Sequence, residues 1–114
     1  YSVHSPTRFN PEVKNTYQAA LKGTENEPYA GYAAMVEPLD DSIGKIMAFL
    51  KKKDLDENTL VVFFSDNGGL QGKTNNAPLR EGKGTLYEGG TRVPMIVRWL
   101  GKVPQEKISE AITS

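Results

Sequence analysis

The sequence contains no cysteine, which excludes a disulfide framework, thiolate metal ligands and a cysteine nucleophile. It also lacks a long apolar run: Leu60 to Phe64, which no other run exceeds, falls far short of the about 20 residues that cross a bilayer. Its 14 basic and 14 acidic residues cancel, so no net charge draws the chain to nucleic acid or to an anionic membrane. We therefore expect no nucleic-acid or membrane partner, and any charge chemistry must be local.

The length of 114 residues suits one small domain and no more. Apolar residues make up 38% and charged residues 25%, a composition that favours a folded chain over a disordered one. We expect residues 1–114 to form a single unit around one core.

Two helices are predicted in the first half of the chain. From Tyr32 to Leu50 the apolar residues recur in steps of three and four, the pattern of an amphipathic helix. Pro38 lies inside this pattern and predicts a kink or a late helix start. A shorter helix is expected within Pro11 to Lys22, in an otherwise turn-rich segment.

The second half predicts two strands joined by a long loop. Thr59 to Ser65 is a continuous β-branched and aromatic run, typical of a parallel central strand buried on both faces. Val93 to Val97 is a second apolar run, and the segment between the two is rich in glycine. This order of elements predicts an α/β fold, and so long a loop in a compact domain is usually functional.

Three places in the sequence could carry chemistry. Asp66 and Asn67 follow the first predicted strand directly and offer the hard oxygens that Ca²⁺ or Mg²⁺ prefers, although an Asx turn would use the same residues. Lys83 lies between two glycines and could meet an anionic ester, although a plain surface loop has the same composition. His4, the one histidine, could donate a proton or bind an anion, or could be structural.

Taken together, the motifs resemble the type I sulfatases of the alkaline phosphatase superfamily. Their order and spacing both match that family. The matching segments are Tyr32-Ala33-Ala34-Met35-Val36 with Leu39-Asp40 and Ile43-Gly44, Ser65-Asp66-Asn67-Gly68-Gly69, Gly82-Lys83-Gly84-Thr85 continuing through Tyr87-Glu88-Gly89-Gly90-Thr91-Arg92-Val93-Pro94, and Val3-His4-Ser5-Pro6.

The resemblance implies a fold, a reaction and a set of site residues. The fold would be part of an alkaline phosphatase-like sandwich, with a mixed, mostly parallel central sheet flanked by helices. The reaction would be hydrolysis of a sulfate ester by a formylglycine nucleophile, with calcium as the cofactor. By this resemblance, Asp66 and Asn67 are calcium ligands, and His4 and Lys83 are catalytic residues that contact the sulfate.

The family's nucleophile segment has no counterpart in this sequence. In that family, formylglycine arises within a Cys/Ser-x-Pro-x-Arg segment. Ser5-Pro6-Thr7-Arg8 lacks the intervening residue. Glu88 and Arg92 match other motif positions, to which we assign a loop-supporting role. We therefore expect a single partial sulfatase catalytic domain over residues 1–114. Alone it should be inactive, bind calcium weakly or not at all, and self-associate through uncovered strands.

Alternatives remain open at this point. A phosphodiesterase or phosphonate hydrolase of the same superfamily would also bind a tetrahedral anion beside a metal. A non-catalytic calcium-binding or carbohydrate-binding module would keep the fold without the chemistry. For a sulfatase, a sulfated glycan or small molecule is the expected substrate. Because the relatives are mostly secreted, periplasmic or lysosomal, a periplasmic or secreted location is expected.

Overall fold

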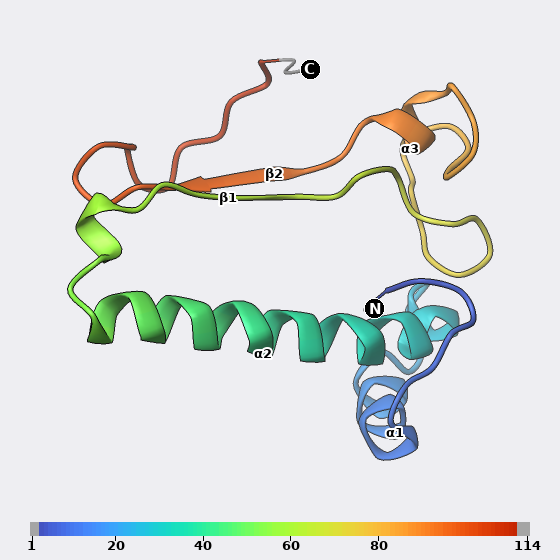
Figure 1. The fold of residues 1–114 in the computed structure, drawn as a ribbon. Coiled ribbons are helices and arrows are strands. Elements are labelled where there is room, and N and C mark those ends of the chain that lie inside the picture. Colours follow the sequence, from blue (N-terminus) through green and yellow to red (C-terminus); the bar gives the residue numbers. More distant parts are fainter. Residues whose placement is uncertain (1–2, 112–114) are drawn as a thin grey trace.

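The computed structural model describes residues 3–111 and has an α/β composition. Its main elements are the long helix α2 and a two-stranded ribbon that runs alongside it (Figure 1). The helix α1 and the short helix α3 lie at the same end of this arrangement. In chain order the elements are α1 (Pro11–Ala20), the 3₁₀ turn η1 (Glu27–Tyr29), α2 (Ala30–Lys52), the 3₁₀ turn η2 (Asp56–Asn58), β1 (Val61–Phe64), α3 (Glu88–Thr91) and β2 (Met95–Arg98).

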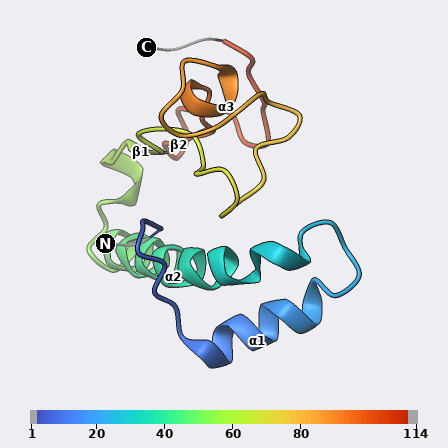
Figure 2. The same ribbon diagram turned by 90° about the vertical axis from the view of Figure 1, so that its right-hand side faces the viewer.

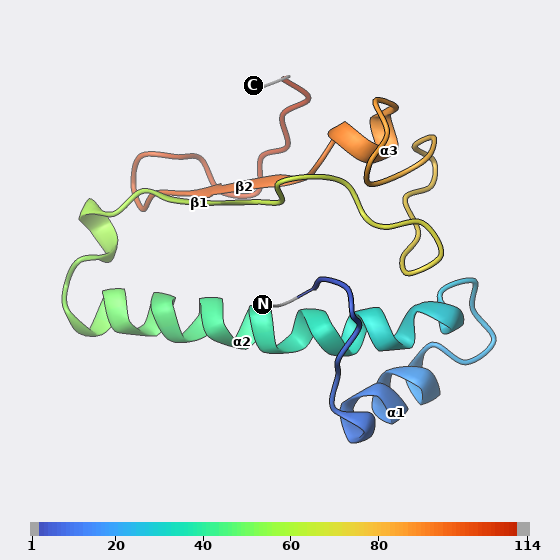
Figure 3. The same cartoon turned by 45° about the vertical axis from the view of Figure 1, so that its right-hand side comes forward.

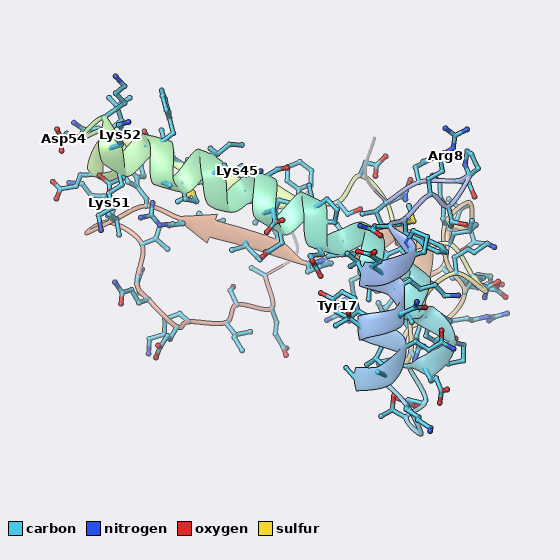
Figure 4. The ribbon with its side chains drawn as sticks, turned by 90° about the horizontal axis from the view of Figure 1, so that it is seen from below. Arg8, Tyr17, Lys45, Lys51, Lys52 and Asp54 are labelled. Atoms are coloured by element: carbon cyan, nitrogen blue, oxygen red, sulfur yellow. The ribbon has the colours of Figure 1, made fainter. Side chains whose placement is uncertain are left out.

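The amphipathic helix predicted from the apolar spacing is confirmed as α2. Its late start is wrong, because the helix begins at Ala30 and continues through Pro38. A single proline removes one backbone donor, and a helix of this length retains its hydrogen bonds on both sides. Lys51 and Lys52 lie in the last turn, where their charge complements the helix dipole (Figure 4). No helix among the described residues is both long and apolar enough to span a membrane.

The predicted short helix is also confirmed, as α1. The Asn10 side chain accepts a hydrogen bond from the Glu12 amide at 2.9 Å, and Pro11 occupies the first turn, where its missing N–H costs nothing. Helix α1 packs along α2 (Figure 2), with Tyr17 on α1 (Figure 4). The nearby Glu37 carboxylate raises the pKa of Tyr17, and burial raises the pKa of Tyr32.

The predicted parallel sheet is wrong within the described residues. Strands β1 and β2 pair antiparallel, with Val61 opposite Arg98 and Phe64 opposite Met95. The reason is the path of the connection: residues 65–94, with the four-residue helix α3, stay at the end of the ribbon where β1 finishes, so β2 begins there and runs back along β1 (Figure 1). The mixed α/β class is confirmed, but a mostly parallel central sheet is not seen here.

Within residues 3–111 the first strand is not buried on both faces, in line with the uncovered strands expected of a partial domain. Val62, Phe63 and Phe64 are exposed, the last at 61% of its surface. Helix α2 runs alongside the ribbon (Figure 3), but it leaves these side chains exposed. A continuous apolar run shows that a strand needs covering on both faces, and the described residues do not supply that cover.

The described core is correspondingly small. Among residues 3–111, the buried apolar side chains are Ala30, Ala34 and Met35, all from α2. The radius of gyration is 16.2 Å, against about 13 Å for a compact domain of this length. The structure is therefore open, as expected of a partial domain with uncovered strands.

Candidate functional site

The site is built on residues 65–94, which we call the connecting loop because they join β1 to β2. Three backbone hydrogen bonds tie its distant parts together. The Gly68 amide donates to the Gly90 carbonyl oxygen at 2.9 Å, and the Gly89 amide donates to Arg80 at 2.8 Å. The Lys83 amide donates to the Gly69 carbonyl oxygen at 3.0 Å. This loop is a folded structure that fixes its backbone, rather than a plain surface loop.

Glycine is required where two backbones of the loop touch. A Cβ atom at Gly68 would overlap the carbonyl oxygen of Gly89, and a Cβ atom at Gly82 would overlap the carbonyl oxygen of Gly69. Both glycines are buried. The glycine content of the segment therefore reflects close backbone packing around Lys83.

Asn76 ties the same parts together through its side chain. Its Oδ1 atom accepts from the Gly69 amide at 3.1 Å, and its Nδ2 atom donates to the carbonyl oxygens of Gly69 at 2.8 Å and Glu81 at 3.2 Å. Our sequence reasoning did not single out this residue. The available signal, asparagine close to Ala77-Pro78, indicates a turn and gives no indication of partners five and seven residues away.

The structure brings His4 and Lys83 together, although they are 79 residues apart in the sequence. The Lys83 Nζ atom lies 3.1 Å from the His4 Nε2 atom. The His4 Nδ1 atom lies 2.7 Å from the Ser5 carbonyl oxygen, which can only accept, so Nδ1 carries the proton. Nε2 is then the acceptor of a proton donated by the Lys83 ammonium. Both residues predicted to contact sulfate thus meet at one point, while their roles remain predictions.

Asp66 and Asn67 lie just beyond the end of β1, as the sequence predicts. Asp66 is exposed and Asn67 is half-buried, with its Nδ2 atom donating to the Gly68 carbonyl oxygen at 2.9 Å. That bond assigns the amide nitrogen to the protein and leaves the Oδ1 atom available to a cation. Two residues after Asn67, the Gly69 carbonyl oxygen accepts a hydrogen bond from the Lys83 amide. This bond links the backbone of the two predicted ligands to the backbone of Lys83.

The donor set fits a hard cation in kind but is incomplete in number. Carboxylate and amide oxygens are the ligands Ca²⁺ takes, and it usually takes 6–8 of them. Within residues 3–111, no group of three or more Asp, Glu or His side chains gathers as a metal site. Asp66 and Asn67 by themselves therefore supply fewer oxygens than a calcium ion takes, and their role as calcium ligands stays a prediction.

Glu88 and Arg92 pair with each other at the start and end of α3. The Arg92 Nη1 atom lies 3.4 Å from the Glu88 Oε2 atom, and both side chains are mostly exposed. An exposed pair of this kind contributes little stability. The backbone bond from the Arg92 amide to the Glu88 carbonyl oxygen, at 2.8 Å, closes the same turn. Their predicted loop-supporting role stays a prediction.

Similarity to known proteins decides the family. The family model described as Sulfatase matches residues 1–114. The chain belongs to the sulfatase family. It is 38% identical to a sulfatase of Formosa agariphila over 96% of its length, and 36% identical to the N-acetylgalactosamine-6-sulfatase of Rattus norvegicus over 99%. It covers 21% of each of those proteins, so the chain spans about a fifth of the length of these curated relatives.

Two solved structures are similar to this chain in fold and sequence. The crystal structure of Ps i-CgsB superposes with a TM-score of 0.74 at 41% identity, over 89% of this chain and 22% of that one. The structure of Ps i-CgsB in complex with k-i-k-neocarrahexaose gives a TM-score of 0.73 at 40% identity. The recognition of a type I sulfatase region from its motifs is therefore confirmed.

Proposed function

We propose that these residues form the sulfate-contacting part of a sulfatase catalytic domain, and that the complete protein containing them hydrolyses sulfate esters. The observation that carries this proposal is the 3.1 Å contact between Lys83 Nζ and His4 Nε2 in a chain of the sulfatase family. Two nitrogen groups that lie 79 residues apart in the sequence meet beside the glycine-packed connecting loop. Such a pair suits a tetrahedral oxyanion.

The hydrogen-bond pattern assigns different tasks to the two residues. The Lys83 ammonium has three N–H donors, of which one points to His4 and two remain for sulfate oxygens. His4 orients that ammonium and donates only when its Nε2 atom is protonated. Lys83 is therefore the residue that stabilises negative charge on the sulfate as the ester bond breaks.

Asp66 and Asn67 would hold calcium through their free oxygens in the complete protein. The bound cation would supply further stabilisation of charge on the sulfate. The remaining calcium ligands and the formylglycine nucleophile would come from residues outside this sequence. Without the nucleophile, the 114-residue chain alone should hydrolyse no sulfate ester.

The exposed surface supports a larger catalytic domain. The chain exposes 9279 Å², whereas a compact monomer of 12.6 kDa exposes about 6,200 Å². The excess of roughly 3,000 Å² is well above the ~800 Å² that each partner contributes to a standard interface. We infer that additional parts of the sulfatase domain cover the ribbon and the facing side of α2.

The proposed substrate is a sulfated carbohydrate. Support comes from the relatives' names, N-acetylgalactosamine-6-sulfatase in several species, and from the neocarrahexaose complex of Ps i-CgsB. A steryl-sulfatase of Rattus norvegicus is 38% identical over 95% of the chain, so a steroid sulfate belongs among the substrates to be compared. We propose a periplasmic or secreted location on the basis of the family alone.

The test uses the complete protein, assayed on para-nitrophenyl sulfate with and without calcium. We expect calcium-dependent hydrolysis of the sulfate ester and little turnover of bis-para-nitrophenyl phosphate. Lys83→Ala should lower kcat/KM at least tenfold, equivalent to about 1.4 kcal/mol of transition-state stabilisation.

The matched control is Lys73→Ala. Lys73 lies in the same loop, is exposed, and makes none of the side-chain hydrogen bonds found among the described residues. The kcat/KM of the Lys73→Ala variant should stay within twofold of wild type. A Lys83→Ala enzyme with full activity, or a protein that prefers the phosphate diester, would contradict the proposal.

A further inference from the structure

The Asn76 side chain links two parts of the connecting loop, the backbone at Gly69 and the backbone at Glu81. It binds both the amide and the carbonyl oxygen of Gly69, and its second N–H reaches the Glu81 carbonyl oxygen. Asn76 is half-buried and uses both its amide oxygen and its amide nitrogen in these contacts. We call this set of three hydrogen bonds the Asn76 bridge.

The Asn76 bridge is connected to the backbone of Lys83 through the Gly69 carbonyl oxygen. The Gly69 carbonyl oxygen that receives the Asn76 amide also receives the Lys83 backbone amide at 3.0 Å. Glu81, the third anchor, precedes Lys83 by two residues. The bridge therefore fixes the segment on which Lys83 is carried, and through it the place where the ammonium meets His4.

We propose that Asn76 is a positioning residue for the sulfatase reaction, acting by holding Lys83 in register with the Asp66-Asn67 end of β1. This inference rests on the proposed function for the role of Lys83 itself. Asn76 makes no contact with His4 or with the Lys83 side chain among the contacts found. Its effect on catalysis must pass through the Gly69 peptide, so it should disappear once the Lys83 ammonium is removed.

The substitution Asn76→Asp tests the bridge with almost no change in shape. A carboxylate can still accept from the Gly69 amide but cannot donate to the two carbonyl oxygens. The neighbouring residue provides a matched control, because the Asn75 Oδ1 atom only accepts, from the Ala77 amide at 2.9 Å. Asn75→Asp therefore introduces the same charge one residue away while keeping its hydrogen bond.

The experiment compares five forms of the complete protein: wild type, Asn76→Asp, Asn75→Asp, Lys83→Ala, and Asn76→Asp combined with Lys83→Ala. We expect Asn76→Asp to lower kcat/KM at least tenfold, and Asn75→Asp to stay within twofold of wild type. The double variant should lie within twofold of Lys83→Ala alone. A residue that merely supports folding would instead multiply the two losses.

Hydrogen exchange of the connecting loop, followed by mass spectrometry on the same proteins, tests whether the Asn76 bridge protects the loop amides. This measurement does not depend on catalytic activity. Peptides containing the Gly69 and Lys83 amides should exchange at least tenfold faster in Asn76→Asp, and at the wild-type rate in Asn75→Asp. Where Asn76→Asp does not accumulate as a folded protein, Asn76→Ala removes the bridge without adding charge and takes its place.

The outcomes separate this inference from the proposed function. Unchanged exchange in the Asn76 variant, or a double variant in which the two losses multiply, would overturn the positioning role. A wild-type protein that hydrolyses no sulfate ester would instead overturn the proposed function, and the exchange measurement would still decide whether Asn76 holds the loop. Faster exchange together with a non-multiplying loss of kcat/KM supports both.

Discussion

The same substitution, glycine to alanine, should have opposite effects at two positions of this chain. At Gly68 the added methyl group would overlap backbone atoms of Gly89, and no flexible side chain is available to move aside. The loop must therefore shift, which strains the packing and stretches the 2.9 Å hydrogen bond from the Gly68 amide to Gly90. At Gly44, in the middle of α2, a methyl group would meet nothing within 4 Å.

The magnitudes follow from these two environments. Overpacking costs about 1–3 kcal/mol, and the loss of a backbone hydrogen bond about 1 kcal/mol. Reduced freedom of the unfolded chain returns about 0.4–1 kcal/mol, so Gly68→Ala should destabilise by about 2–3 kcal/mol. Gly44→Ala should stabilise by about 0.5–1 kcal/mol, because alanine is the better helix former.

Thermal unfolding followed by circular dichroism at matched protein concentration measures both effects. Gly68→Ala should lower Tm by roughly 10 °C and Gly44→Ala should raise it by roughly 4 °C, on the usual scale for domains of this size. A Gly68→Ala protein as stable as wild type would refute the close packing of the connecting loop. A loss of stability in Gly44→Ala would refute the open surface assigned to that side of α2.

Three further predictions concern the 114-residue chain itself. The raised pKa values of Tyr17 and Tyr32 mean that the folded state retains phenol protons which the unfolded state loses near pH 10.0. The free energy of unfolding should therefore fall as pH rises above 10.0, and Tyr17→Phe with Tyr32→Phe should flatten that decline in urea titrations; a decline unchanged by both would contradict it. Calorimetry should detect calcium binding no tighter than micromolar, because Asp66 and Asn67 supply too few of the 6–8 oxygens required; submicromolar binding would show a complete site. Light scattering after size-exclusion chromatography should show self-association at micromolar concentration, since the β1–β2 ribbon leaves both edges and apolar side chains open; a stable monomer of 12.6 kDa would show that the chain covers them itself.

Local patterns in the sequence determined the elements and the family. The three-and-four spacing from Tyr32 to Leu50 predicted α2, because the period of an amphipathic helix depends only on residues that are close in the sequence. Asp66 and Asn67 were placed correctly at the end of β1, since a strand end follows from composition and turn residues. The spacing of the motifs identified a sulfatase, which the family match over residues 1–114 confirmed.

The tertiary structure decided what depends on distant contacts. The apolar run in β1 does not specify the direction of its partner strand, so the antiparallel pairing emerged only from the return path of the connecting loop. The meeting of His4 with Lys83 required the chain to close over 79 residues. Asn76 resembles an ordinary turn residue in sequence, and only the folded loop shows its amide bound to Gly69 and Glu81. A side-chain amide has no preferred partner until the backbone groups around it are in place, which is why the sequence specified the site residues but not what holds them together.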